Sequence, residues 1–184
     1  MTEPTAFTGP TGPTGPAVRT RDLTMTVNGA RRTAPAEDRT LLSDHLRRGL
    51  GLTGTHAGCE QGVCGACTIL VDDVPVRSCL MLAVQAEGRS VRTVEGLENR
   101  PDGELSSLQK DFLDHHGLQC GFCTPGLLMS LAHAEEEGLT EQQVTTTVLP
   151  GHLCRCTGYG GIRAAVECHW KRRAASGDQE AGHE

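Results

Sequence analysis

The stretch Gly58–Leu80, GCEQGVCGACTILVDDVPVRSCL, decides how this chain must fold, because it gathers thiol groups around a glycine-rich loop. Its cysteines are Cys59, Cys64, Cys67 and Cys79. The first three follow the spacing C-x4-C-x2-C, and the fourth stands twelve positions further on. The intervening TILVDDVPVR is typical of a β-hairpin, which would return the last thiol to the loop. Four converging thiols predict a metal centre.

The spacing of these cysteines is that of plant-type ferredoxins, in which thiolates hold a [2Fe-2S] cluster. The bridging sulfides of such a cluster also need backbone N–H donors. Gly58, Gly62 and Gly65 allow the loop to wrap closely and to expose its amides. Zinc is the alternative, but zinc sites usually combine two C-x2-C pairs, and this stretch has one. The sequence therefore favours an iron–sulfur centre.

A second set of cysteines lies further along the chain, in QCGFCTPG and LCRCTGYGG. Its members are Cys120, Cys123, Cys154 and Cys156. Taken alone, a C-x2-C pair with a C-x-C pair is compatible with zinc as well as with a cluster. Each pair precedes an expected helix start, at Thr124 and at Gly160, and helix N-termini stabilise thiolates and anionic clusters.

Composition excludes several classes of protein. The chain has 184 residues, 3% aromatic residues and nine cysteines, so a large self-sufficient core is not expected and metal or partners must add stability. A formal net charge of −6 argues against nucleic-acid binding. The apolar runs are too short to span a bilayer, and the N-terminus has no apolar core typical of a signal peptide. Clustered cysteines then predict metal binding in a reducing cytoplasm.

Changes in composition along the sequence predict how the chain divides into domains and linkers. We expect a disordered Thr/Gly/Pro arm over residues 1–20, a domain over 21–95, a linker over 96–103, a second domain over 104–175 and a flexible tail over 176–184. The first domain alternates apolar and polar residues, with a hairpin turn at Asn28-Gly29 and a helix that Thr40 is expected to cap. Strands around one helix predict a small α+β domain.

In the second domain, the alternation typical of strands is absent, and apolar residues recur at helical spacing instead. Leu105, Leu108 and Phe112 share one helical face, and Thr124-Pro125 is typical of a helix start. Further helices are expected after Thr140 and around Val166. Four short helices in this length predict a bundle.

Together, the two sets closely resemble the small iron–sulfur subunit of the molybdenum hydroxylases, the xanthine oxidase and aldehyde oxidoreductase family. The motifs that carry the resemblance are GCEQGVCGACT, QCGFCTPG and LCRCTGY, with LTGTHAG leading into the first. The resemblance extends from about Leu23 to Trp170. His152 departs from it, since the family often has Asn there, and Gly160-Gly161 replaces a more varied pair. Neither departure touches an expected ligand.

The resemblance implies a fold and its ligands. The N-terminal part would be a β-grasp ferredoxin-like domain with a [2Fe-2S] cluster, and the C-terminal part a four-helix bundle with another. The ligands implied for the first cluster are Cys59, Cys64, Cys67 and Cys79, and for the second Cys120, Cys123, Cys154 and Cys156. This agrees with the α+β pattern derived from the residues.

The resemblance also implies a function. The chain would be the electron-transfer subunit of a heteromeric enzyme that hydroxylates an aldehyde, an N-heterocycle or a similar substrate with oxygen from water, and would not be catalytic alone. Electrons would leave a molybdenum–pterin cofactor on a large subunit and pass through the helical-domain cluster and then the ferredoxin-domain cluster. FAD on a medium subunit would receive them, in a dimer of heterotrimers.

By the same resemblance, Gln119 and Cys156 are expected beside the pterin. Gln119 offers an amide that can hydrogen-bond a pterin edge, and Cys156 would be the cluster ligand nearest to it. Two alternatives compete with this interpretation. One is a free-standing two-cluster ferredoxin serving diffusing partners, and the other is a structural zinc protein.

Overall fold

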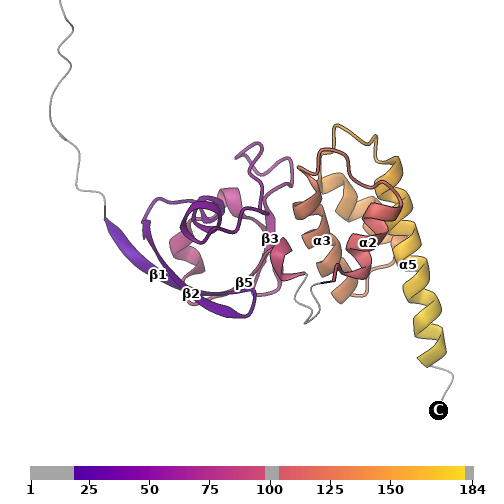
Figure 1. Ribbon diagram of the computed structural model, residues 1–184, viewed down its shortest axis with the longest axis horizontal. Helices are drawn as coiled ribbons and strands as arrows, with labels where there is room; N and C mark the ends of the chain where they lie inside the picture. The colour runs from indigo at the N-terminus through magenta and orange to yellow at the C-terminus, as the bar shows by residue number, and fades with distance from the viewer. Residues whose placement is uncertain (1–18, 98–103, 181–184) are drawn as a thin grey trace, which may run out of the picture.

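The computed structural model describes residues 19–97 and 104–180, so most of the predicted arm over 1–20 and of the linker over 96–103 lies outside it. The strands are β1 (Thr20–Val27), β2 (Ala30–Glu37), β3 (Thr68–Val71), β4 (Val74–Arg77) and β5 (Ser90–Arg92). The α-helices are α1 (Leu42–Asp44), α2 (Ser107–Asp114), α3 (Thr124–Glu136), α4 (Glu141–Gln143) and α5 (Gly160–Glu180). The strands and α1 form one half of the molecule and the other helices form the second half (Figure 1).

Tight two-residue turns build the sheet. Asn28 and Gly29 have positive φ angles of 51° and 78°, and the β1–β2 hairpin closes on the Val27–Ala30 pair. This confirms the predicted Asn-Gly turn, whose backbone twist suits adjacent strands. Asp72 and Asp73, with φ of 48° and 64°, connect β3 to β4 in the same way.

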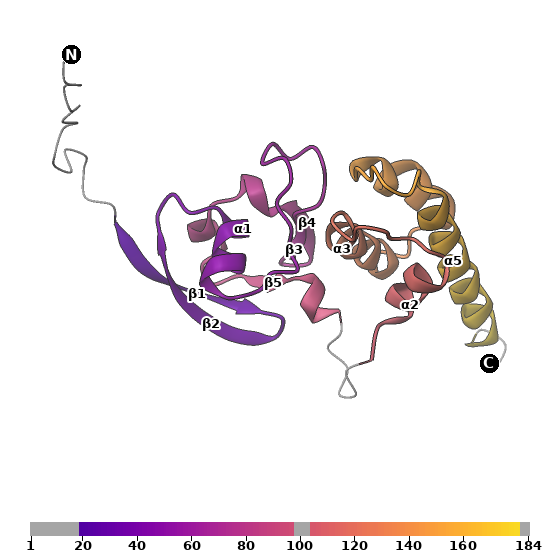
Figure 2. The ribbon, with the colours of Figure 1, turned by 45° about the horizontal axis from the view of Figure 1, so that its top comes forward.

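The sheet order is β2-β1-β5-β3-β4. β1 and β5 are parallel, and the other neighbours are antiparallel. α1 and the π-helical turn His45–Gly49 that continues it lie across one face of the sheet (Figure 2). Their buried Leu42 and Leu46 join a core with strand residues such as Leu23 and Ile69. The predicted α+β arrangement of the first half is therefore present.

One helix start differs from the sequence prediction, and one agrees with it. α1 begins at Leu42 with Leu41 at the N-cap position and no side-chain cap, so Thr40 does not cap it. The backbone of Thr40 is engaged elsewhere, because its N–H donates to Glu37 and its carbonyl accepts from Ala83. α3 has Cys123 at the N-cap position, so Thr124 is its first helical residue.

α3 is central to the helical half, where its apolar residues join α2 and α5 in one core. The buried residues of this core include Leu108, Phe112, Leu127, Leu131, Ile162 and Val166. α4 continues directly into the π-helical turn Val144–Val148 and the 3-10 turn Leu149–Gly151. α5 runs on to Glu180, so residues 176–180, which the sequence analysis assigned to a flexible tail, are helical. The Ser176 hydroxyl donates to the Arg172 carbonyl one turn earlier.

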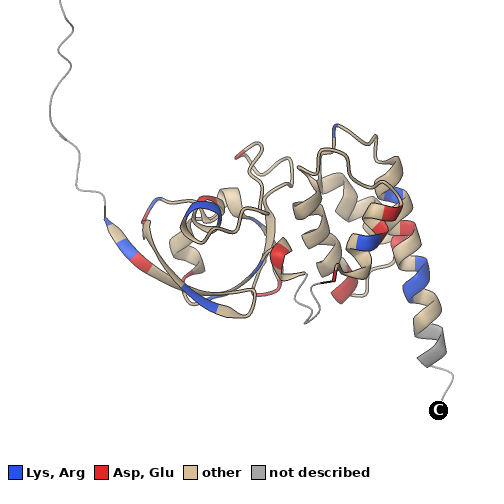
Figure 3. Ribbon diagram, in the orientation of Figure 1, with Lys and Arg blue, Asp and Glu red and all other residues tan. Residues whose placement is uncertain are grey.

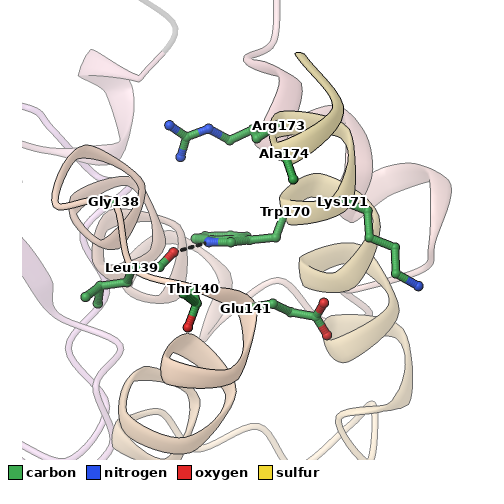
Figure 4. Close-up of a pocket in the computed structure, with 8 residues that line it drawn as sticks. All are labelled: Gly138, Leu139, Thr140, Glu141, Trp170, Lys171, Arg173 and Ala174. Carbon is green, nitrogen blue, oxygen red and sulfur yellow. Dashed lines mark hydrogen bonds between the residues drawn. The ribbon is translucent and has the colours of Figure 1, made fainter. Parts of the chain in front are cut away.

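Trp170 fastens α5 to the loop after α3. Its indole N–H donates to the Leu139 carbonyl over 2.6 Å, as Figure 4 shows. The ring is 7% exposed and lines a shallow pocket with Gly138 and Thr140. A large buried ring with a satisfied N–H gives this aromatic-poor domain much of its apolar contact.

A charged cluster joins α2 to α5, where acidic and basic residues stand close together (Figure 3). The side chain of Asp111 is 3% exposed and accepts from both Arg172 and His169. Burial alone would raise the pKa of Asp111, but hydrogen bonds from Arg172 and His169 outweigh it and lower this pKa. The buried carboxylate is therefore paired, as its burial requires.

The two halves meet through backbone contacts at α3 and β3, which lie side by side in both ribbon views (Figures 1 and 2). A Cβ atom added to Gly126 would lie 2.2 Å from the Gly65 carbonyl oxygen and 2.7 Å from that of Ala66. At the other end of α3, Arg92 donates two hydrogen bonds to Glu136, of 2.7 and 2.6 Å. None of the described helices has the length and hydropathy to span a bilayer.

Gly126→Ala tests how tightly the halves are joined. The new methyl group must displace backbone atoms, and such overpacking costs about 1–3 kcal/mol. We expect a lower thermal midpoint for Gly126→Ala. The matched control is Gly160→Ala, where an added Cβ meets nothing within 4 Å, so its midpoint should stay unchanged or rise slightly. Equal midpoints for the two variants would contradict the close contact.

Candidate metal centres

The first set of cysteines lies in the loop before β3 and just after β4. Cys59 and Cys64 are half-buried in the loop before β3, while Cys67 and Cys79 are buried. Electrostatic interactions link Cys59 to Cys64, and Cys79 to Cys67. The β3–β4 hairpin returns Cys79 to the loop, so the set consists of an outer pair and an inner pair.

Backbone N–H groups donate hydrogen bonds to Cys59, one thiol of the outer pair. The N–H groups of Gln61 and Cys64 each donate to the Cys59 sulfur over 3.4 Å. These bonds, with that from Cys64 the strongest, lower the pKa of the Cys59 thiol to about 6. Gly62 and Gly65 have φ angles of 77° and 80°, a region that glycine enters without strain, and so let the loop curl around the sulfur. The loop therefore stabilises a thiolate before any metal is bound.

Cys79, a thiol of the inner pair, favours its protonated form. Burial, followed by the neighbouring Cys67 thiol, raises the pKa of Cys79 to about 11. A buried thiol of this kind is protonated at neutral pH, whereas a coordinated metal ion deprotonates it. Cys79 is thus suited to a metal and unsuited to an isolated thiolate.

The second set is divided in the same way. Cys120 and Cys156 are exposed, and their sulfur atoms lie 3.3 Å apart. Cys123 is buried and Cys154 is half-buried, and burial and the Cys154 thiol raise the pKa of Cys123 to about 12. Gln119, the other residue expected at a pterin, is exposed beside Cys120. The ninth cysteine, Cys168, is half-buried on α5.

Local hydrogen bonds favour a thiolate at Cys154. The Thr157 hydroxyl lies 3.1 Å from the Cys154 sulfur. Burial would raise the pKa of this thiol, but the hydroxyl and the backbone N–H groups of Thr157 and Cys156 outweigh burial and lower it. The second set therefore combines a thiol whose pKa is raised with one whose pKa is lowered, like the first.

Tyr159 holds the C-x-C loop in shape. Its hydroxyl accepts from the Cys154 N–H and donates to the His152 carbonyl, both over 2.9 Å. Tyr159 has a φ angle of 65°, which a non-glycine residue adopts only under local constraint. These two bonds tie the backbone on both sides of Leu153 to the Tyr159 hydroxyl.

The donor sets fit [2Fe-2S] clusters better than single metal ions. In the part of the chain that the structure describes, no three His, Cys, Asp or Glu side chains are arranged to hold one ion. A zinc site would bring four ligands to a single ion. An outer and an inner pair of thiols suit a cluster of two irons, each of which takes two thiolates. The exposed amides near Cys59 match the need of such a cluster for hydrogen bonds.

The two sets are joined by direct contacts that the sequence analysis did not predict. The N–H of Leu153, beside Cys154, donates to the Cys64 carbonyl over 2.9 Å. His56 Nδ1 lies 2.9 Å from the Phe122 carbonyl, and the two rings stack at 4.8 Å. His56 therefore lies between the loops of the two sets.

His152 and Arg77 occupy the space between the halves. His152 is 3% exposed, and its Nε2 lies 2.8 Å from the Ser130 hydroxyl. Burial, and then the positive charge of Arg77, lower the pKa of His152 to about 4, so it is neutral at pH 7. Both residues lie within two positions of a cysteine, which is the signal that could have marked them.

Comparison with family profiles divides the chain at the same place as its geometry. Residues 25–93 match the 2Fe-2S iron–sulfur cluster binding domain. Residues 93–167 match the [2Fe-2S] binding domain. Each match contains one of the two cysteine sets.

Similar proteins extend the comparison over most of the chain. Caffeine dehydrogenase subunit gamma from Pseudomonas sp. (strain CBB1) is 54% identical over 79% of this chain and 88% of its own length. The xanthine dehydrogenase iron-sulfur-binding subunit of Escherichia coli O157:H7 is 44% identical over 78% of this chain and 91% of its own. The crystal structure of quinoline 2-oxidoreductase from Pseudomonas putida 86 superposes with a TM-score of 0.74 and 50% identity, covering 80% of this chain and 90% of the matched chain.

Tyr159→Phe tests whether the Tyr159 hydroxyl stabilises the C-x-C loop of the second set. The variant keeps the ring but loses both hydrogen bonds of the hydroxyl, each worth about 0.5–1.5 kcal/mol. We expect the second centre to lose metal faster under a chelator while the first centre is unaffected, as followed by visible circular dichroism. Thr24→Val, which removes an exposed hydroxyl pair with Thr33 on the β1–β2 hairpin, is the control. Equal loss from both centres in Tyr159→Phe would argue against this role.

Proposed function

The chain belongs to the small iron–sulfur subunits of the xanthine dehydrogenase and aldehyde oxidoreductase family, and from this membership we propose that it is the electron-transfer subunit of a molybdenum hydroxylase. The observation that carries the proposal is the pair of four-thiol sites, one in each half, whose loops touch through Leu153 and Cys64. The chain supplies no catalytic residue of its own and acts within an oxidoreductase complex.

Each half would hold one [2Fe-2S] cluster. The proposed ligands are Cys59, Cys64, Cys67 and Cys79 in the ferredoxin-like half, and Cys120, Cys123, Cys154 and Cys156 in the helical half. When bound, the clusters supply one-electron transfer from the molybdenum–pterin centre of a large subunit towards FAD on a medium subunit. The proposed four-helix bundle would consist of α2, α3, α5 and a composite helix. The composite helix is α4 together with the turns that continue it.

The exposure of the thiols supports a direction of transfer. Cys120, Cys156 and Gln119 are all exposed on the helical half, where a partner carrying a pterin can reach them. Cys123 and Cys154 lie on the inner side, next to the loop of the first set. We propose that the helical-domain centre faces the donor and the ferredoxin-domain centre faces the acceptor.

Several finer points of the proposal rest on the family. The domains would span 21–95 and 104–175, and the complex would be a dimer of heterotrimers in the cytoplasm. Names of relatives include caffeine dehydrogenase and quinoline 2-oxidoreductase, so an N-heterocycle is the substrate class that we favour over an aldehyde. Gel filtration of the native complex separates this proposal from a free-standing two-cluster ferredoxin, which would elute without partner subunits.

Cys64→Ser and Cys123→Ser test the ligand sets. Electron paramagnetic resonance of the reduced wild-type protein should show two distinct [2Fe-2S] signals, since the two sites differ in burial and hydrogen bonding. Cys64→Ser should remove the signal of the ferredoxin-like half and Cys123→Ser that of the helical half. Stoichiometric zinc, or loss of the opposite signal, would refute the assignment. Cys168→Ser, which lies outside both sets, is the matched control and should keep both signals.

Gln119→Ala tests whether the helical-domain centre faces the electron donor. The variant removes the proposed hydrogen bond to the pterin without touching a ligand, and one such bond is worth about 0.5–1.5 kcal/mol. Reduction of the clusters by substrate in the assembled enzyme should therefore slow about twofold to tenfold. Reduction by dithionite should be complete in both proteins. An unchanged rate with substrate, together with slower reduction of flavin from reduced clusters, would reverse the proposed order.

A further inference from the structure

We propose that Arg77 is a positioning residue that fixes the two cluster-bearing halves against each other and raises the reduction potential of the ferredoxin-domain cluster. This inference rests on the proposed function, because it requires the two clusters. Arg77 is the last residue of β4 and stands two positions before Cys79. Its side chain is partly buried between the halves of the molecule.

One guanidinium reaches three segments that carry ligands. Its Nε donates to the Gly62 carbonyl over 3.4 Å, within the loop between Cys59 and Cys64. Its Nη1 donates to the hydroxyl of Thr68, the residue after Cys67. Its Nη2 crosses to the helical half and donates to the Gly151 carbonyl over 2.6 Å.

The geometry of these contacts requires arginine. The acceptors lie in three directions around a planar fork, which a lysine ammonium on a flexible stem cannot match at once. Thr68 is itself fixed, because its hydroxyl donates to the Gly65 carbonyl over 2.6 Å. The Arg77 side chain thus connects the metal-binding loop, the hairpin that returns Cys79 and the segment leading to Cys154.

The positive charge of Arg77 is not neutralised by a carboxylate. All three of its acceptors are neutral oxygens, and among the side chains described in residues 19–97 and 104–176 no ion pair joins it to Asp or Glu. Arg92, in contrast, crosses the same interface with Glu136 and also contacts Asp73.

An unpaired, partly buried positive charge beside a redox centre favours its reduced form. Reduction adds one negative charge to the cluster, and Coulomb attraction in a medium of reduced dielectric constant stabilises that charge. Second-shell charges and hydrogen bonds tune metal centres in this way. Arg77 touches two segments of the ferredoxin-domain site and one of the helical-domain site, so the first cluster should respond more strongly.

Two substitutions separate the effect of the Arg77 charge from the effect of its three hydrogen bonds. Arg77→Gln removes the charge but keeps an amide donor, whereas Arg77→Lys keeps the charge and loses the planar fork. Arg92→Gln is the matched control, since Arg92 crosses the same interface with a charge that Glu136 and Asp73 neutralise. Each variant is prepared as the full chain with its clusters, and the potentials are measured by redox titration monitored by electron paramagnetic resonance. Thermal midpoints are measured on the same samples.

In Arg77→Gln, we expect the equilibrium constant for one-electron reduction of the ferredoxin-domain cluster to fall about tenfold, a shift of about 59 mV. The helical-domain cluster should shift less. Arg77→Lys should keep a potential near that of the wild type but show a lower thermal midpoint. Arg92→Gln should lower the thermal midpoint and leave both potentials unchanged.

Unchanged potentials in Arg77→Gln, or an equal shift in Arg92→Gln, would overturn this inference and leave the proposed function standing. A shift in Arg77→Lys as large as that in Arg77→Gln would show that geometry and not charge sets the potential, which also overturns it. Absence of both cluster signals from the wild-type protein would refute the proposed function and this inference with it.

Discussion

Thiol groups that converge in partly buried loops must be balanced by positive charge, and the rest of the structure follows from this requirement. Burial raises the pKa of Cys79 and Cys123, so these thiols favour protonation until a metal is present. The chain has only 3% aromatic residues, and its two apolar cores are small. Metal binding then contributes to folding as well as to redox chemistry, because the ligand loops close over what they bind.

The same requirement explains why each site is divided into an outer and an inner pair. The outer thiols lie where backbone amides or solvent can stabilise them, as the two N–H groups at Cys59 show. The inner thiols Cys67, Cys79 and Cys123 are buried, and Cys154 is half-buried. The loops of the two sets touch through Leu153 and Cys64, as a relay of electrons between two clusters would require.

The preferences of neighbouring residues made much of the fold predictable from the sequence. The Asn28-Gly29 turn and the hairpin around Asp72-Asp73 follow from positive-φ propensities of neighbouring residues, and both are confirmed. The first cysteine set was predicted from its spacing and the second from the family resemblance, and both ligand sets stay predictions. Helix starts were less predictable, because a tertiary bond between Ala83 and the Thr40 carbonyl decided the first one. The bonds of Arg77 to Gly151 and of His56 to Phe122 join residues far apart in sequence, and no local pattern encodes them.

The close approach of Gly126 to the Gly65 carbonyl limits how charge can move through the protein. Some redox proteins swing a tethered domain between donor and acceptor, and such motion needs a weakly packed joint. Here the joint is backbone against backbone, and the bidentate pair of Arg92 and Glu136 closes its other end. We therefore expect the two halves to move as one body and to keep their metal-binding loops at a constant distance. Transfer between those loops should therefore proceed at the same speed in dilute buffer and in a viscous medium such as concentrated glycerol.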